Sequence, residues 1–300
     1  MPGMTKLALP PVFISHGSPM TALEPREAGA FMQRLGPAID RTFGRPRAIL
    51  AVSAHTMARA PVLLAAERHE AVYDFGGFDP QLYTLRYDAP GAPELAGRVQ
   101  GLLQAAGIDV HRVDEGGLDH GIWTPLRYVY PAADVPVLPL AFVPSWSPQR
   151  LFDLGRALAP LADEGVWVMG SGSLTHNLRM VFGGGRPPVD SPEIAESAAF
   201  RDWVRERAAA ADWPALLDYR RQAPHAALMH PTDEHWLPWY PAAGAAVAAA
   251  TGVAAGAADT ASSSGPAGLR LHASQTFGCL AMDAYAFGAG AAVLQDALVA

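Results

Sequence analysis

The sequence predicts an α/β protein in which a mixed central sheet is covered by helices on both faces. Short apolar runs bounded by turn residues predict buried strands, and amphipathic segments between them predict helices. Strands that alternate with helices favour a largely parallel sheet. Two closely spaced apolar runs near the C-terminus predict a hairpin, which adds antiparallel strands to that sheet.

The expected strands are rich in Val, Ile, Leu and Ala, as strands buried on both faces usually are. They lie at residues 11–15, 48–53, 62–66, 135–142 and 166–170, and the C-terminal hairpin at 269–274 and 280–286. Helical spacing of leucine and valine predicts one helix around residues 95–103 and another around 151–161.

Two stretches are expected to be irregular. Residues 183–188 form a Gly/Pro loop, and residues 251–268 are rich in Ala, Ser and Gly without an apolar face, which is typical of a mobile segment. The Ala-rich piece before the second stretch, from about 241 to 250, favours helix by propensity alone. No linker or internal repeat divides the chain of 300 residues.

Composition narrows the possible functions. Half of the residues are apolar, 17% are charged, the formal net charge is −7, and Lys6 is the only lysine. A chain without a basic face is not expected to bind nucleic acid. No apolar run reaches the roughly 18 residues of a membrane span, and the N-terminus does not resemble a signal peptide, so a soluble cytoplasmic protein is expected. With one cysteine, Cys279, any metal site must use His, Asp or Glu.

Histidines follow three of the predicted strands. His16 comes directly after the first strand, His55 after the second, and His176 after the strand at 166–170 and a Gly/Ser loop. Open α/β sheets bind ligands at the carboxyl edge of their strands, so these imidazoles are expected to lie close together. A lone histidine at a strand end is often a capping residue, and the spacing matches no compact motif. The residues alone therefore leave a metal site and a structural role both open.

Other histidines lie in polar, turn-like segments. His120 follows Asp119, and His235 follows Glu234, so both carboxylates could orient a neighbouring ring. His225 and His230 flank the segment of His235, and either could be a spare ligand or a substrate contact.

Six segments around these histidines resemble, in order, the extradiol ring-cleavage dioxygenases of the DOPA-dioxygenase type, within the superfamily of class III protocatechuate 4,5-dioxygenase β subunits. The resemblance covers nearly the whole chain, and six segments in the same order are far more specific than any one of them. The segments are FISHGSP at 13–19, VSAH at 52–55, YDFGGF at 73–78, LDHGIW at 118–123, GSG with THNL between 170 and 178, and PTDEHWLP at 231–238.

The resemblance implies one three-layer α/β/α catalytic domain over residues 4–290, with a mixed central sheet. It also implies that His16, His55 and His235 bind one divalent metal ion. By the same resemblance, His176 matches the acid/base histidine, and His120 matches a histidine that contacts substrate or oxygen. Its expected reaction is the opening of a DOPA-like catechol by O2 to a muconate semialdehyde. The protocatechuate enzymes have a glutamate where His235 stands here, which leaves the choice between Zn²⁺ and Fe²⁺ open.

The metal decides between classes of function. Ring cleavage requires Fe²⁺, whereas three neutral histidines suit zinc equally well, and protein isolated in air is expected to carry zinc. Zinc has no redox chemistry, so a zinc hydrolase with His176 as base is one alternative. A non-enzymatic binding protein is another, although such a protein would not need five histidines. The sequence does not predict the oligomeric state.

Aromatic residues in the resembling segments are candidates for the wall of a catechol pocket. They are Phe75, Phe78 and Trp123, and each of them could instead be core packing.

Overall fold

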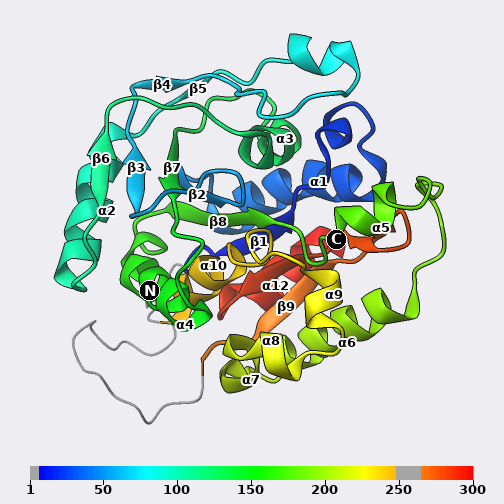
Figure 1. The fold of residues 1–300 in the computed structure, drawn as a ribbon. Coiled ribbons are helices and arrows are strands. Elements are labelled where there is room, and N and C mark those ends of the chain that lie inside the picture. The colour runs from blue at the N-terminus through cyan, green and yellow to red at the C-terminus, as the bar shows by residue number, and fades with distance from the viewer. Residues whose placement is uncertain (1–6, 248–264, 300) are drawn as a thin grey trace.

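The computed structural model describes residues 7–247 and 265–299. An eight-stranded mixed sheet forms its middle layer, and helices cover both faces (Figure 1). The fold is thus the α/β/α arrangement expected from the sequence. In sheet order, the strands are β6 (His111–Val113), β3 (Val62–Leu64), β7 (Val137–Ala141), β2 (Ala48–Ser53), β8 (Val166–Gly172), β1 (Val12–Ser15), β12 (Ala284–Phe287) and β9 (Gly268–His272).

The four middle strands β7, β2, β8 and β1 are parallel, and antiparallel strands flank them on both sides. The expected C-terminal hairpin is confirmed as the antiparallel pair of β9 and β12. Its connection is longer than a simple turn, because it contains a second small ladder of β10 (Gln275–Thr276) and β11 (Leu280–Ala281). Another two-stranded ladder joins β4 (Arg68–His69) to β5 (Ala89–Pro90).

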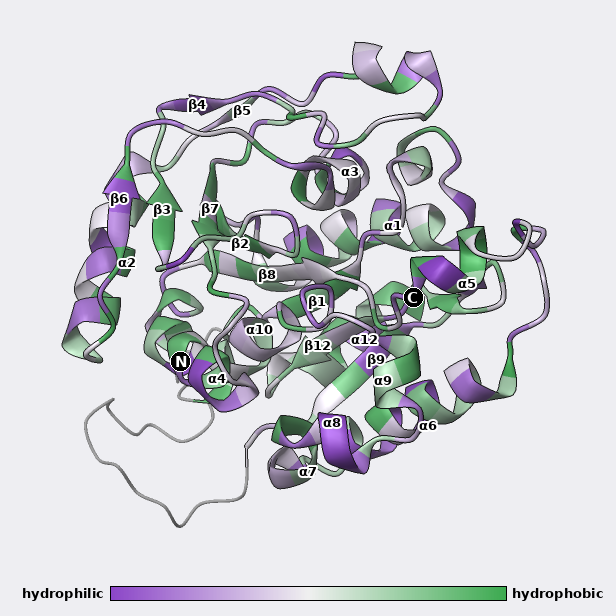
Figure 2. Ribbon diagram, viewed as in Figure 1, coloured by the Kyte–Doolittle hydropathy of each residue, from purple (hydrophilic) through white to green (hydrophobic). Residues whose placement is uncertain are grey.

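Successive residues of the middle strands point to opposite faces and build two separate cores. In β2, Leu50 and Val52 pack into one core, whereas Ile49 and Ala51 pack into the other. Figure 2 shows that these strands are hydrophobic, while outer helices such as α2 and α8 carry hydrophilic residues. Burial on both faces explains why the strands could be recognised as continuous apolar runs.

One face of the sheet is covered by α1 (Arg26–Phe43), α3 (His120–Val129) and α12 (Gly290–Val299). The packed fold therefore continues beyond residue 290. The other face is covered by α2 and by several helices from the second half of the chain. They are α2 (Pro93–Ala105), α4 (Pro148–Leu158), α6 (Ala195–Ala209), α7 (Trp213–Leu217), α8 (Tyr219–Gln222), α9 (Ala226–Met229) and α10 (Trp239–Ala245).

The remaining elements are short. They are α5 (Leu178–Phe182) and the 3₁₀ turns η1 (Pro19–Ala22), η2 (Pro80–Thr84) and η3 (Ala159–Leu161). The expected Gly/Pro loop at 183–188 is irregular. The expected mobile stretch lies mostly outside the described residues, as does the end of the Ala-rich helix. No helix among the described residues is long and apolar enough to cross a membrane.

Candidate active site

The carboxyl ends of three adjacent parallel strands position the first two histidines. Past the end of β1, the backbone N–H of His16 donates to the carbonyl of Gly172, 3.0 Å away. Past the end of β2, the N–H of Ala54 donates to the carbonyl of Ser171, 2.9 Å away. Because β8 lies between β1 and β2, both connections bring the following side chains toward the end of β8. His16 and His55 thus meet at the sheet edge.

A distant segment adds His235 to the same edge. The N–H of Ser173 donates to the carbonyl of His235, 2.9 Å away, which seats the segment before α10 on the end of β8. Gly172 makes this approach possible, because a Cβ atom there would lie only 2.0 Å from the His235 carbonyl oxygen. The position of His235 is therefore set by its own backbone.

Three ring nitrogens converge in this arrangement. The Nε2 atom of His55 lies 3.2 Å from Nε2 of His16 and 3.2 Å from Nε2 of His235. Ligands of one tetrahedral zinc ion, at ~2.0–2.1 Å from the metal, lie ~3.3 Å from one another. The observed spacing fits a shared metal ion.

The partners of the other ring nitrogens define the tautomers. The hydroxyl of Ser171 donates to the carbonyl of Gly121, so Nδ1 of His16, 2.9 Å from that hydroxyl oxygen, is the donor. Nδ1 of His235 lies 3.1 Å from a Glu234 carboxylate oxygen, which can only accept. The proton of each neutral ring is therefore on Nδ1, and the Nε2 lone pairs point at one another. Nitrogen lone pairs that face one another in this way suit a divalent metal ion as their common partner.

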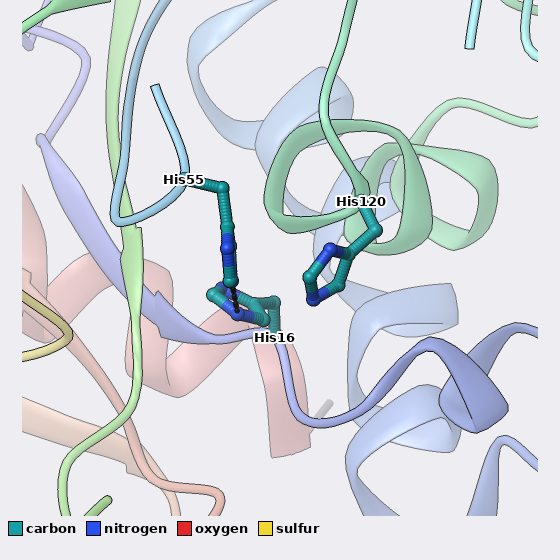
Figure 3. A group of neighbouring side chains, drawn as sticks. All are labelled: His16, His55 and His120. Atoms are coloured by element: carbon teal, nitrogen blue, oxygen red, sulfur yellow. Dashed lines mark hydrogen bonds between the residues drawn. The ribbon is translucent and has the colours of Figure 1, made fainter. Parts of the chain in front are cut away.

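His120 joins the group as the first residue of helix α3, whereas the sequence predicted an irregular, turn-like segment there. The Asp119 carboxylate caps this helix by accepting from the N–H of Gly121, 2.7 Å away. Figure 3 shows His55 and His120 side by side, with both rings directed toward His16. Their ring centroids are 4.0 Å apart. Asp74 lies behind them, with carboxylate oxygens 3.0 Å from Nδ1 of His120.

His176 stacks on His235, with ring centroids 3.5 Å apart and planes 10° from parallel. Its backbone N–H donates to the carbonyl of Met229, 2.9 Å away, which fixes the loop after β8. His176 also lines the large cavity beside the site. All five predicted histidines are thus brought together.

Burial and crowding favour the neutral form of four of these rings, those of His16, His55, His176 and His235. Burial is the main cause that lowers the pKa of His55 to about 3 and of His176 to about 2, and the neighbouring histidines lower both further. The pKa values of His16 and His235 are also lowered, again chiefly by burial. Neutral imidazole is the form that binds a metal ion or accepts a proton.

The histidines lie at the bottom of a cavity of about 810 Å³. Four of them line it, namely His55, His120, His176 and His235, and Phe75 and Phe78 form part of its wall. Trp123 does not line the cavity. It is fully buried, and its indole N–H donates to the carbonyl of Val72, 3.1 Å away. The expected contact of Trp123 with substrate is thus replaced by a supporting role behind Phe75.

The structure gives Asp119 and His230 contacts that differ from those expected from the sequence. Asp119 touches no imidazole; its carboxylate accepts from the hydroxyls of Ser53 and Thr56 instead. His230 belongs to neither group of possible metal ligands and does not line the cavity, and its Nε2 donates to the carbonyl of Leu174, 2.8 Å away. His225 lies at the start of α9 in the left-handed region, with φ of 56°, and does not line the cavity.

Several residues of the site were missed by the sequence reasoning. Asp74 stands inside the YDFGGF segment, where only the aromatics drew attention. Ser171, which fixes the tautomer of His16, gave no signal of its own. Leu178, Phe182, Arg186 and Phe277 line the outer part of the cavity, and only their position in the fold reveals this.

Distance alone permits more than one set of metal ligands. His16, His55 and His120 offer ring nitrogens within 4.8 Å of one another, as do His176, Glu234 and His235 with their ligand atoms. The donor set of neutral imidazoles fits a divalent transition metal ion.

Histidines clustered at the edge of an α/β sheet, beside an aromatic-walled cavity, are typical of an enzyme active site, and their ring nitrogens are close enough together to hold a metal ion. Comparison with known proteins gives the family. Residues 10–262 match the model of the catalytic LigB subunit of aromatic ring-opening dioxygenases, and the chain belongs to this family. It is therefore an extradiol ring-cleaving dioxygenase, which argues against the binding-protein and hydrolase alternatives.

Relatives of known name agree. The chain is 39% identical to 4,5-DOPA dioxygenase extradiol of Beta vulgaris over 78% of this chain and 85% of the relative. It is 35% identical to the protein of the same name from Escherichia coli K12, over 78% of this chain and 84% of the relative. A crystal structure of an uncharacterized Escherichia coli K12 protein superposes with a TM-score of 0.69 at 29% identity, covering 93% of this chain and 100% of that one.

Proposed function

We propose that His16, His55 and His235 hold one divalent metal ion and that the enzyme uses it, with O2, to open the ring of a substituted catechol. One observation carries the proposal. The Nε2 atom of His55 is 3.2 Å from Nε2 of each of the other two, and the Nδ1 protons of those two are held by Ser171 and Glu234. Lone pairs directed at one point are the arrangement that a metal ion needs.

Iron(II) at this position would supply the one-electron chemistry through which O2 and a catechol can react, whereas zinc has no redox chemistry. The three histidines bind either ion. We therefore propose iron(II) as the catalytic metal and expect zinc to occupy the same ligands when it is present.

His176 serves as the general base. The neutral ring lines the cavity, and its stacking on His235 fixes its plane. It accepts the proton of a catechol hydroxyl on a ring nitrogen and returns it later to an oxygen of the product. A positioned acid/base group contributes roughly 10²–10⁴-fold to a rate.

His120 has a role set by its tautomer. With Nδ1–H donated to Asp74, its Nε2 atom first accepts a hydrogen bond or proton from the substrate. Once protonated at Nε2, the ring becomes a donor, and the adjacent carboxylate balances its charge. His120 can then stabilise negative charge that develops on oxygen.

The cavity and the relatives both support a particular class of substrate. Phe75 and Phe78 offer an aromatic wall, and the volume of about 810 Å³ leaves room for a substituent on the ring. Relatives named 4,5-DOPA dioxygenase extradiol support a catechol with an arm like that of DOPA. The product would be a muconate semialdehyde.

The decisive experiment compares metals on one preparation. Protein freed of metal and loaded with Fe²⁺ without oxygen should consume one O2 per substituted catechol and form a yellow semialdehyde. Zn²⁺-loaded protein should be inactive, and added Zn²⁺ should inhibit by competition. Iron-loaded protein that consumes no O2 with any catechol would contradict the proposal.

The ligand set has its own test. His55→Ala and His235→Ala should remove most of the bound metal, measured by elemental analysis after desalting. His120→Ala is the matched control. It removes a ring that also lies close to His16 and His55, but the metal should stay bound. Metal loss in His120→Ala with retention in His235→Ala would exchange the two assignments.

A further inference from the structure

One carboxylate faces two histidines of the site at once. Both oxygens of Asp74 lie 3.0 Å from Nδ1 of His120, and Oδ1 also accepts from the His120 backbone N–H at 3.0 Å. Oδ2 lies 3.5 Å from Nδ1 of His55. Asp74 is thus placed behind both rings that Figure 3 shows pointing at His16.

The contact defines what each ring can do. A carboxylate only accepts hydrogen bonds, so Nδ1 of His120 must carry its proton, and Nδ1 of His55 is favoured to carry one. The lone pair of each ring is then on Nε2, which faces the cluster. Metal-binding histidines commonly owe their tautomer to such an acceptor, but here one acceptor serves a proposed ligand and a proposed catalytic histidine together.

The segment of Asp74 is held firmly against the start of α3. The N–H of Val72 donates to the carbonyl of Leu118, 2.7 Å away, and the N–H of Leu118 donates to the carbonyl of Glu70, 2.9 Å away. On the other side of Asp74, the ring of Phe75 packs against His120 with centroids 5.7 Å apart and planes nearly perpendicular. The backbone on one side and an aromatic ring on the other therefore restrict the carboxylate.

We propose that Asp74 is a positioning residue that sets the tautomers of both His55 and His120. Because Phe75 packs against His120 beside Asp74, the cavity wall and the proposed metal ligands are held by the same segment. The inference rests on the proposed function, in which His55 binds metal and His120 handles a substrate proton. Asp74 does not itself contact the reacting atoms. Since its side chain is 23% exposed, a simple ion pair there would contribute little, and its effect is expected in geometry.

Asp74→Asn gives the sharpest test, because it keeps the shape and changes one acceptor into a donor. The amide oxygen of the new side chain is expected to accept from the backbone N–H and the Nδ1–H of His120, because an NH₂ group in that place would put donor against donor. The NH₂ group then faces Nδ1 of His55 and forces that nitrogen to accept, which moves the proton of His55 to Nε2, toward the metal position. Metal affinity should fall by roughly 10–100-fold.

Asp74→Ala is the paired variant, and it affects the other ring more. Without an acceptor, water can replace the carboxylate at His55, so metal affinity should fall less than in Asp74→Asn. His120 should lose its fixed tautomer, which ¹⁵N NMR of histidine-labelled protein detects with and without zinc. Asp74→Glu should restore part of both properties, and Glu70→Gln, an exposed acid in the same segment, should change neither.

The outcomes separate this inference from the proposed function. A His120 that keeps the Nδ1–H tautomer in Asp74→Ala, or an Asp74→Asn protein with the Zn²⁺ affinity of the wild type, would overturn the role of Asp74. If wild-type protein binds no divalent ion, the proposed function fails, and the NMR comparison still decides whether Asp74 sets the tautomer of His120.

Discussion

Two buried polar clusters lie on either side of β1, and they differ in whether their charges are balanced. The histidine cluster at the carboxyl edge consists of neutral rings whose lone pairs face one another. The second, which we name the ion cluster, consists of Arg201, Asp283, Glu193 and Arg270. Arg201 donates to Asp283 at 2.6 Å and to Glu193 at 2.7 Å, and Arg270 lies 3.4 Å from Asp283.

The difference shows how a functional polar cluster can be told from a structural one. The ion cluster contains two arginines and two carboxylates, so its charges balance within the cluster. The histidine cluster contains only acceptors at its centre, and it is open to a large cavity. The two are also connected, because the hydroxyl of Ser15, the residue before His16, donates to the carbonyl of Asp283, 2.8 Å away.

The largest expected effect concerns the histidine cluster. His176→Ala should lower the turnover of iron-loaded enzyme by roughly 10²–10⁴-fold while metal content stays unchanged, because it removes a proton acceptor and no ligand. Turnover is measured as O2 consumption per bound iron. If the variant instead loses its metal as His55→Ala does, then His176 is a fourth ligand.

A substitution in the ion cluster should have the opposite signature. Arg201→Leu leaves the fully buried Asp283 without its nearest cation, so the free energy of unfolding should fall by about 3 kcal/mol, since Arg270 remains nearby. Urea unfolding measures this loss. Arg205→Leu on the exposed side of α6 is the control and should cost little. Arg201→Leu protein that binds metal much more weakly would show that the clusters are not separable.

Metal should stabilise the histidine cluster and leave the ion cluster unaffected. A divalent ion at about 100 times its dissociation constant should raise the free energy of unfolding by about 2.7 kcal/mol, because only the folded chain brings the ligands together. Thermal unfolding with and without Zn²⁺ measures the gain. The gain should vanish in His55→Ala and persist in Arg201→Leu; a gain of equal size in His55→Ala would place the ion elsewhere.

The smallest expected effect concerns a residue outside both clusters that could help to select the substrate. Arg186 lines the outer cavity, with its guanidinium 4.9 Å from the ring centroid of Phe277. Arg186→Gln should lower kcat/KM by up to about tenfold for a catechol with a carboxylate arm, since it removes a charged donor. It should leave 4-methylcatechol unaffected. Equal losses for both substrates would point to a structural role for Arg186.

The sequence could predict the strands and the histidines because both depend on local signals. The runs at β2 and β8 are apolar on both faces, and His16 and His55 follow directly after strands. His235 could be placed beside His16 and His55 only through the resemblance, because no local signal predicts that its carbonyl will contact the end of β8. The extent of β8 was underestimated, since its last residues, Ser171 and Gly172, read as a loop.

Other features depend on contacts between distant segments. Asp74 acquires its role only when the segment at 71–79 lies beside the start of α3. For Trp123 the sequence left the cavity wall and core packing both open, because an aromatic residue of a helix can face either side, and the structure shows core packing. α1 was not predicted from the sequence, although its buried residues Phe31, Leu35 and Ile39 lie at helical spacing. The ion cluster joins residues from α6, β9 and the approach to β12, and no spacing along the chain reveals it.

Gly172 has a consequence for how this enzyme tolerates change. The residue has no side chain and takes no part in any reaction, yet the carbonyl of His235 occupies the space that a methyl group would need. A mutational survey would therefore find that position 172 does not tolerate substitution, although its residue has no functional group. The effect of an added methyl group would appear far along the chain. It would push the backbone of His235 away from β8 and so move the imidazole of His235 away from the other histidines.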